Sequence, residues 1–136
     1  MLIRLIYASE STQPLTPAAV QTLVDHARQA NARRQITGVL AFDHRAFLQC
    51  LEGDRETVSG VFCRIAADPR HRRVVLLELQ PVDERLFGSW DMGFAAADAI
   101  GRDAFLRFGS GVSFDPHAMT ASAALGLLQA LEARIS

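Results

Sequence analysis

Three polar side chains fall at positions where the sequence pattern predicts a protein interior. Tyr7 ends an apolar run, Asn31 continues the apolar stripe of a predicted helix, and Gln49 lies in the middle of a predicted strand. A buried phenol or amide without a hydrogen bond costs about 1–3 kcal/mol, so the three together predict a polar ligand or a satisfied internal network. A phenol can give up an electron and a proton, and an amide both donates and accepts hydrogen bonds without adding a charge.

The first half of the chain alternates between predicted strands and a predicted helix. The run 2–7 is rich in β-formers and predicts a strand. Thr16 followed by Pro17 is typical of a helix start, and apolar residues then recur at helical spacing, which predicts a helix over about 17–30 with Asn31 next on the stripe. The runs 38–42 and 46–52 predict a hairpin. The second of these runs is apolar on both faces and must be covered on both sides.

The second half again combines a predicted helix with predicted strands and ends in predicted helices. Asp54 is placed to cap a helix whose apolar stripe includes Ile65, with Asp68 next in register before Pro69 ends it. Runs 74–80 and 90–94 predict two more strands. The order βαββαββ predicts an α+β, ferredoxin-like sandwich with both helices on one sheet face. Predicted helices over 102–108 and from 115–116 onward, the latter with an apolar stripe that reaches Ile135, would cover the other face.

Composition predicts one domain, with a core over residues 1–95 and a C-terminal helical cap over 96–136. The 136 residues are 49% hydrophobic and carry a net charge of −1, which gives no basic field for nucleic acid. No apolar run approaches the ~18 residues of a membrane span. Cys50 and Cys63 lack the spacing of a metal or redox pair, so we expect reduced thiols, a cytoplasmic protein and no metal site.

Five segments resemble, in order, the signature blocks of the BLUF family of flavin-binding blue-light sensors. They read LIYASES, NARRQITGVLAF, FLQCLEG, DPRH and FGSWDMGF and cover roughly the first 95 residues. The resemblance implies that an oxidised flavin ring lies between the two helices. FAD is the expected flavin, and FMN or riboflavin would also fit.

The resemblance also implies which residues hold the flavin. Leu23 and Ile65 would contact the ring faces, and Asn31 would bind the pyrimidine edge. Three further residues would lie near the ring's polar edge and the ribityl chain: Asp68, Arg70 and His71. Judged from the residues alone, DPRH can also be read as a helix stop with charges in solvent, and each polar residue taken singly can be read as a structural hydrogen-bonder.

By the same resemblance, Tyr7 donates an electron and Gln49 relays the proton, after which the hydrogen bonds around the flavin C4=O are rearranged. Trp90 and Met92, expected to share one face of the strand 90–94, would transmit this change to the C-terminal helices, and Met92 would also contact the flavin pocket. Trp90 is equally readable as core filling. Ser9 matches a family serine that would support Tyr7 or the Trp90 side.

The expected function is therefore blue-light signalling rather than enzyme catalysis. We expect no output domain after the cap, so an unidentified partner protein or self-association as a homo-oligomer would carry the signal. Two alternatives remain open at this point: a small enzyme, such as a flavin-dependent oxidoreductase or an acylphosphatase-like hydrolase, and a flavin-free assembly module of ferredoxin-like fold. The chain lacks the G-x-S-x-G, Walker and G-x-G-x-x-G motifs.

Overall fold

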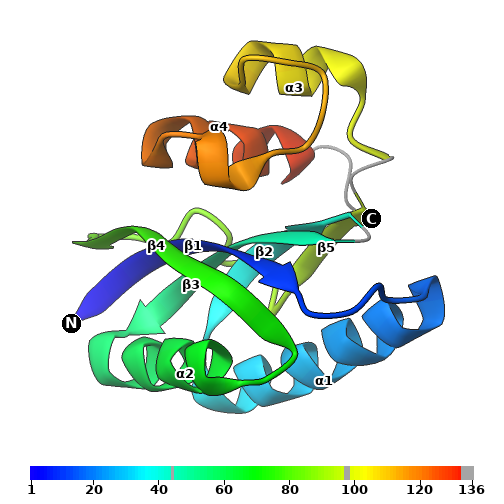
Figure 1. Ribbon diagram of the computed structural model, residues 1–136. Helices are drawn as coiled ribbons and strands as arrows, with labels where there is room; N and C mark the ends of the chain where they lie inside the picture. The colour runs from blue at the N-terminus through cyan, green and yellow to red at the C-terminus, as the bar shows by residue number, and fades with distance from the viewer. Residues whose placement is uncertain (44, 97–98, 133–136) are drawn as a thin grey trace.

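The computed structural model describes residues 1–43, 45–96 and 99–132 (Figure 1). Its elements follow the predicted order, but the strands predicted over 2–7, 46–52 and 74–80 are longer than expected. In chain order they are β1 (Leu2–Ser11), α1 (Pro17–Arg34), β2 (Thr37–Phe42), β3 (Ala46–Asp54), α2 (Arg55–Ala67), β4 (His71–Pro81), β5 (Gly93–Ala96), α3 (Arg102–Phe108), the 3-10 helix η2 (Pro116–Ala118) and α4 (Ala121–Glu132).

The strands form one sheet in the order β4-β1-β3-β2-β5. The strands β4, β1, β3 and β2 pair with one another in antiparallel fashion. β5 lies at the edge of the sheet and runs parallel to β2. Figure 1 shows α1 and α2 on one face of the sheet and α3 and α4 on the other. The predicted α+β, ferredoxin-like sandwich with a C-terminal helical cap is therefore confirmed.

Two hydrophobic cores lie on opposite faces of the sheet. The helix-side core, against α1 and α2, includes Leu5, Tyr7, Val24, Phe47, Leu51 and Met92. The cap-side core, against α3 and α4, includes Ile6, Leu48, Cys50, Phe87, Leu127 and Leu128. Successive residues of β3 alternate between the two cores because strand side chains point alternately to opposite faces. This alternation confirms the prediction that β3 is covered on both sides.

Helix α1 extends one turn further than the sequence pattern predicted. Its start is as expected, since the Thr16 side chain accepts a hydrogen bond from the backbone of the first turn at 3.1 Å and Pro17 follows. Its end lies at Arg34 because Gln35 adopts the left-handed conformation, with φ 57°, and its N–H bonds back to helix carbonyls. Asn31 therefore lies within the helix, where it is buried.

The strand predicted over 90–94 is wrong at its start. β5 begins at Gly93, which is the first residue to pair with β2, and the preceding residues form a loop. Outside a strand, side chains two residues apart need not share a face. Trp90 packs against the cap-side core, whereas Met92 is buried in the helix-side core. The prediction that Trp90 and Met92 share one face is therefore also wrong.

The C-terminal cap is built from shorter helices than predicted. The helix predicted over 102–108 is α3, but the one predicted from 115–116 is split into η2 and α4. The split occurs because the Thr120 side chain caps a new helix, accepting a hydrogen bond from the Ala123 N–H at 3.0 Å. Ile135 lies outside the described residues. The residues of α4 that are buried against the sheet are Ala124, Leu127, Leu128 and Leu131.

A buried carboxylate anchors the loop between β4 and β5. Glu52, on β3, is fully buried and accepts hydrogen bonds from Arg4 Nε at 3.2 Å and Thr37 Oγ1 at 3.3 Å. It also accepts from the backbone N–H groups of Leu86 at 2.7 Å and Phe87 at 2.9 Å. A buried charge is tolerated only when it is paired and hydrogen-bonded, and these four donors meet that requirement. The network fixes the middle of the loop that leads into β5.

The described part of the chain has neither a membrane-spanning helix nor a metal-binding cluster. None of its helices is long and apolar enough to cross a membrane. Among the same residues, no cluster of three or more His, Cys, Asp or Glu side chains could hold a metal ion. Both cysteines are free, Cys50 buried and Cys63 exposed on α2.

Candidate functional site

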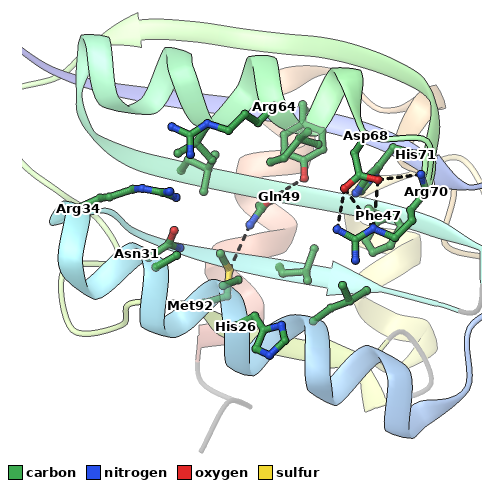
Figure 2. Close-up of a pocket in the computed structure, with 18 residues that line it drawn as sticks. His26, Asn31, Arg34, Phe47, Gln49, Arg64, Asp68, Arg70, His71 and Met92 are labelled. Atoms are coloured by element: carbon green, nitrogen blue, oxygen red, sulfur yellow. Dashed lines mark hydrogen bonds and ion pairs between the residues drawn. The ribbon is translucent and has the colours of Figure 1, made fainter.

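A cavity of about 320 Å³ lies between α1, α2 and the sheet (Figure 2). Its size falls within the range of small-molecule sites, which starts at about 300 Å³. Leu23 and Asn31 of α1 and Ile65 of α2 line it, together with Tyr7 and Gln49 of the sheet. The three polar residues singled out from the sequence therefore meet in one cavity.

Tyr7 and Gln49 form a hydrogen-bonded pair on the sheet side of the cavity. They stand directly opposite each other in the β1–β3 register, and the Tyr7 hydroxyl donates to Gln49 Oε1. Both side chains are buried. Burial raises the pKa of the Tyr7 phenol well above its usual value of 10.0, because the phenolate would be poorly solvated there. Tyr7 therefore holds its proton at neutral and mildly alkaline pH.

The other end of the Gln49 amide faces a sulfur atom. Gln49 Nε2 donates to Met92 Sδ at 3.3 Å, as the dashed line in Figure 2 marks. A thioether is a weak acceptor, and the amide nitrogen carries two hydrogens. Gln49 Nε2 can therefore donate a second hydrogen bond to a stronger acceptor in the cavity, while Oε1 accepts from Tyr7 and Nε2 still donates to Met92.

Asn31 lies at one end of the cavity, and Figure 2 shows Arg34 and Arg64 near it. Asn31 Nδ2 donates to the Asp91 carbonyl at 2.8 Å, which ties α1 to the loop before β5. An amide can still offer its second N–H and its carbonyl oxygen. Asn31 can therefore accept from an N–H and donate to a carbonyl of a ligand.

A charged cluster lies at the opposite end of the cavity (Figure 2). Asp68 ends α2 and accepts hydrogen bonds from Arg70 Nε at 3.1 Å and Arg70 Nη2 at 2.6 Å. These bonds from Arg70 lower the pKa of the Asp68 carboxyl from 3.8 to about 2. The pKa of Arg70 is raised by the same pairing. The DPRH segment thus both ends α2 and lines the cavity.

His71 lies in the same cluster and is held from two sides. Its Nδ1 lies 2.9 Å from Ser9 Oγ, and its ring packs on Phe47 with centroids 4.8 Å apart. Burial lowers the pKa of His71 below 6.5, although the Asp68 carboxylate opposes this shift. The neutral imidazole is therefore favoured at pH 7. Ser9 thus supports the His71 side of the site.

The cavity contains nine residues that the sequence indicated and several that it did not. The nine are Tyr7, Leu23, Asn31, Gln49, Ile65, Asp68, Arg70, His71 and Met92. Trp90, by contrast, packs in the cap-side core. The polar and aromatic lining residues that sequence reasoning missed are His26, Arg34, Phe47 and Arg64, and the apolar ones are Ala27, Ala30, Leu40, Leu51 and Val61. Arg34 lies seven residues after Ala27, and Arg64 four before Asp68, so following the helical stripe beyond its apolar members would have found both.

The fold and the cavity together define a small α+β sensor-like module that can hold a flat, partly polar ligand between two helices. Residues 2–93 match a family model described as BLUF, sensors of blue-light using FAD. The match covers well over half of the chain. This chain therefore belongs to the BLUF family of blue-light sensors, as its sequence blocks indicated.

The curated relatives are much longer proteins. The photoactivated adenylate cyclase subunit beta of Euglena longa is 36% identical over 102 residues, which are 73% of this chain and 12% of that protein. Subunit alpha of Euglena gracilis is 35% identical over 102 residues, again 73% of this chain and 10% of that protein. This chain thus spans only about a tenth of the length of these relatives.

Solved structures resemble the chain along most of its length. The dark-state structure of BlrB, a BLUF protein, has a TM-score of 0.79 at 26% identity and covers 98% of this chain and 96% of its own. The BlsA ground state has a TM-score of 0.78 at 30% identity, covering 95% and 88%. Klebsiella pneumoniae BlrP1 with FMN and cyclic diGMP has a TM-score of 0.71 at 33% identity, covering 98% and 35%.

BLUF domains bind flavin, and the cavity of this chain fits such a ligand. Leu23 and Ile65 supply apolar walls from two different helices, which suits the faces of a flat ring. Gln49 directs an amide donor at a weak sulfur acceptor, and Asn31 offers the donor and acceptor that an imide edge requires. The finding of a sensor family agrees with the expectation that this segment is not an enzyme.

Proposed function

We propose that this chain senses blue light through a bound flavin, with Tyr7 and Gln49 as the photochemical pair. The observation that carries the proposal is the continuous line of hydrogen bonds from the Tyr7 hydroxyl through the Gln49 amide to the Met92 sulfur. This line lies buried at the cavity between α1 and α2. Residues 1–95 would form the flavin-binding core and 96–136 its cap.

Each end of the cavity would serve a different part of the flavin. Leu23 and Ile65 flank the ring faces, and Asn31 binds the pyrimidine edge, with Arg34 and Arg64 close by. Asp68, Arg70 and His71 lie at the opposite end of the cavity from Asn31. We therefore propose that these three residues contact the ribityl chain and not the ring edge that Asn31 binds. FAD is the proposed flavin, supported by the family's description.

The residues divide the chemistry between them. A bound flavin would supply a ring that absorbs blue light and can act as an electron acceptor. Tyr7 gives that electron, and its phenolic proton becomes strongly acidic at the same moment. Gln49 Oε1 already accepts the hydrogen bond from the Tyr7 hydroxyl, so it is placed to take the proton while Nε2 passes another onward. After the electron and proton return, the Gln49 amide is left in a different hydrogen-bonding arrangement.

The signal would leave the cavity through the loop that carries Met92 and Trp90. Met92 contacts Gln49 on the helix side of the sheet, and Trp90 packs in the cap-side core, so this loop joins the two faces. A small change in the Gln49 bond can then bias the packing of the cap. The output is proposed to be a partner protein or self-association as a homo-oligomer, in the cytoplasm.

Colour and photoconversion test the function directly. Purified protein should be yellow and should shift its flavin absorption reversibly to longer wavelength in blue light. Mass spectrometry of the released cofactor distinguishes FAD from FMN. Colourless protein that does not take up flavin would favour the assembly module instead. Flavin that is reduced by a nicotinamide donor and does not photoconvert would favour the oxidoreductase.

The output route is tested by truncating Met92. We expect Met92→Ala to keep the light-induced spectral shift but to lose the light-dependent change in hydrogen exchange over residues 103–132, because the contact from Gln49 to the loop is gone. Met92→Leu, which retains bulk but not the sulfur acceptor, separates packing from hydrogen bonding. An undiminished exchange response in Met92→Ala would show that the signal leaves the cavity by another path.

A further inference from the structure

Arg28 is a charged residue on the buried side of α1. It follows Val24 by four residues and precedes Asn31 by three, so the three side chains share one helix face. Val24 and Asn31 are buried, and the Arg28 side chain is 42% exposed. Arg28 Nε donates to the Met92 carbonyl at 2.8 Å, while its Nη1 lies 3.8 Å from Asp25 Oδ1. The guanidinium thus binds the loop as well as a surface carboxylate.

The loop needs such donors because Met92 precedes the first paired residue of β5. Three successive loop carbonyls accept hydrogen bonds from outside the loop: that of Trp90 from the Gly38 N–H at 3.1 Å, that of Asp91 from Asn31 Nδ2 at 2.8 Å, and that of Met92 from Arg28 Nε at 2.8 Å. Two of these three donors are α1 side chains. The position of Met92 is therefore set by α1 as much as by the sheet.

We propose that Arg28 is a positioning residue: it holds the Met92 sulfur against Gln49 and so sets the lifetime of the light-adapted state. This inference rests on the proposed function of Gln49. The described residues that line the cavity do not include Arg28, so its effect on Gln49 passes through Met92. The Gln49 amide must move past the sulfur each time its hydrogen bonds rearrange. A firmly held Met92 raises the barrier to that movement in both directions.

Arg28→Leu tests the proposal, because leucine keeps high helix propensity and removes the donor. Flavin content and the size of the light-induced shift should match the wild type, while recovery in the dark should become about fivefold faster, as expected if part of the free energy of one charge-assisted hydrogen bond contributes to the barrier. Arg28→Lys keeps a cationic donor and should restore most of the slow recovery. Arg33→Leu removes the same charge from an exposed position of α1 and should leave recovery unchanged.

A second readout does not depend on flavin. The chain has three methionines, so the Met92 methyl signal can be assigned in the NMR spectrum of flavin-free protein by its absence from Met92→Ala. In the wild type this signal should lie away from the position of an exposed methionine, because Met92 is buried against Gln49. Arg28→Leu should move it toward that position, and Arg33→Leu should not.

A double variant shows whether Arg28 acts through Met92. In a Met92→Ala background, adding Arg28→Leu should change the recovery rate no further. Two results would overturn the proposal: an unmoved Met92 methyl signal in Arg28→Leu, or the same acceleration by Arg28→Leu with and without Met92. If the wild-type protein does not photoconvert at all, the proposed function fails, and the NMR comparison still decides whether Arg28 positions Met92.

Discussion

Tyr7→Phe is expected to retain flavin and to lose the reversible red shift almost completely. The phenylalanine ring can keep the packing of Tyr7 against Phe62, where the ring centroids are 5.6 Å apart. The variant lacks the hydroxyl that donates to Gln49, so neither the electron nor the proton that starts the rearrangement is available. The measurement is the absorption difference before and after blue light at matched flavin content.

The pH dependence of the wild-type shift is a control on this assignment. Burial raises the pKa of Tyr7 above 10.0, so the protonated phenol persists as the pH rises. The size of the shift should therefore stay constant up to about pH 9, below the ordinary titration range of tyrosine. A normal shift in Tyr7→Phe would exclude Tyr7 as the donor. A wild-type shift that declines between neutral pH and about pH 9 would show that another group controls the protonation state.

Glu52→Ala is expected to lower the free energy of unfolding by about 3–5 kcal/mol. The change leaves Arg4, whose side chain is 8% exposed, without its buried partner. It also removes the acceptor of two buried backbone N–H groups, those of Leu86 and Phe87. Denaturant unfolding of the flavin-free protein measures the loss, as a lower midpoint at an unchanged slope.

Two variants separate burial from simple loss of charge. Glu10→Ala removes a carboxylate whose own side chain is 12% exposed but whose partners, Arg72 and Arg73, have side chains that are 60% exposed. Because the arginines left behind remain solvated, this change should cost much less stability than Glu52→Ala. The double variant Arg4→Leu with Glu52→Leu removes both buried charges but still leaves the Leu86 and Phe87 N–H groups without an acceptor. It should recover only part of the lost stability. Equal losses in Glu52→Ala and Glu10→Ala would show that the buried network does not carry the loop.

The Tyr7 and Glu52 variants affect different parts of the proposed sensor. In the proposed mechanism Tyr7 and Gln49 provide the change in hydrogen bonding, and Glu52 anchors the loop whose far end presents Met92 to Gln49. Loss of Glu52 should therefore weaken the fold and also loosen the Met92 contact. Because Gln49 and Glu52 lie three residues apart on β3, a single strand supports both the proposed photochemical site and the loop that carries Met92.

The sequence by itself determined the order of the elements and most of the cavity. Repeats of two and of about 3.6 residues are local properties, so they identified β3 as a strand buried on both faces and placed Asn31 on the inward stripe of α1. The quoted blocks identified the family for the same reason, since each is a short continuous segment. Helix ends were less accurate, because the left-handed Gln35 that ends α1 carries no clear local signal.

Only the tertiary structure decided how the loop before β5 lies. Its course depends on hydrogen bonds between residues far apart in the chain, such as Glu52 with Phe87 and Arg28 with Met92, which are 35 and 64 positions apart. Hydrophobic periodicity contains no information about such pairs. The sequence pattern therefore extended β5 back to Trp90 and gave Trp90 and Met92 one face, whereas these long-range bonds turn Trp90 toward the cap and Met92 toward Gln49.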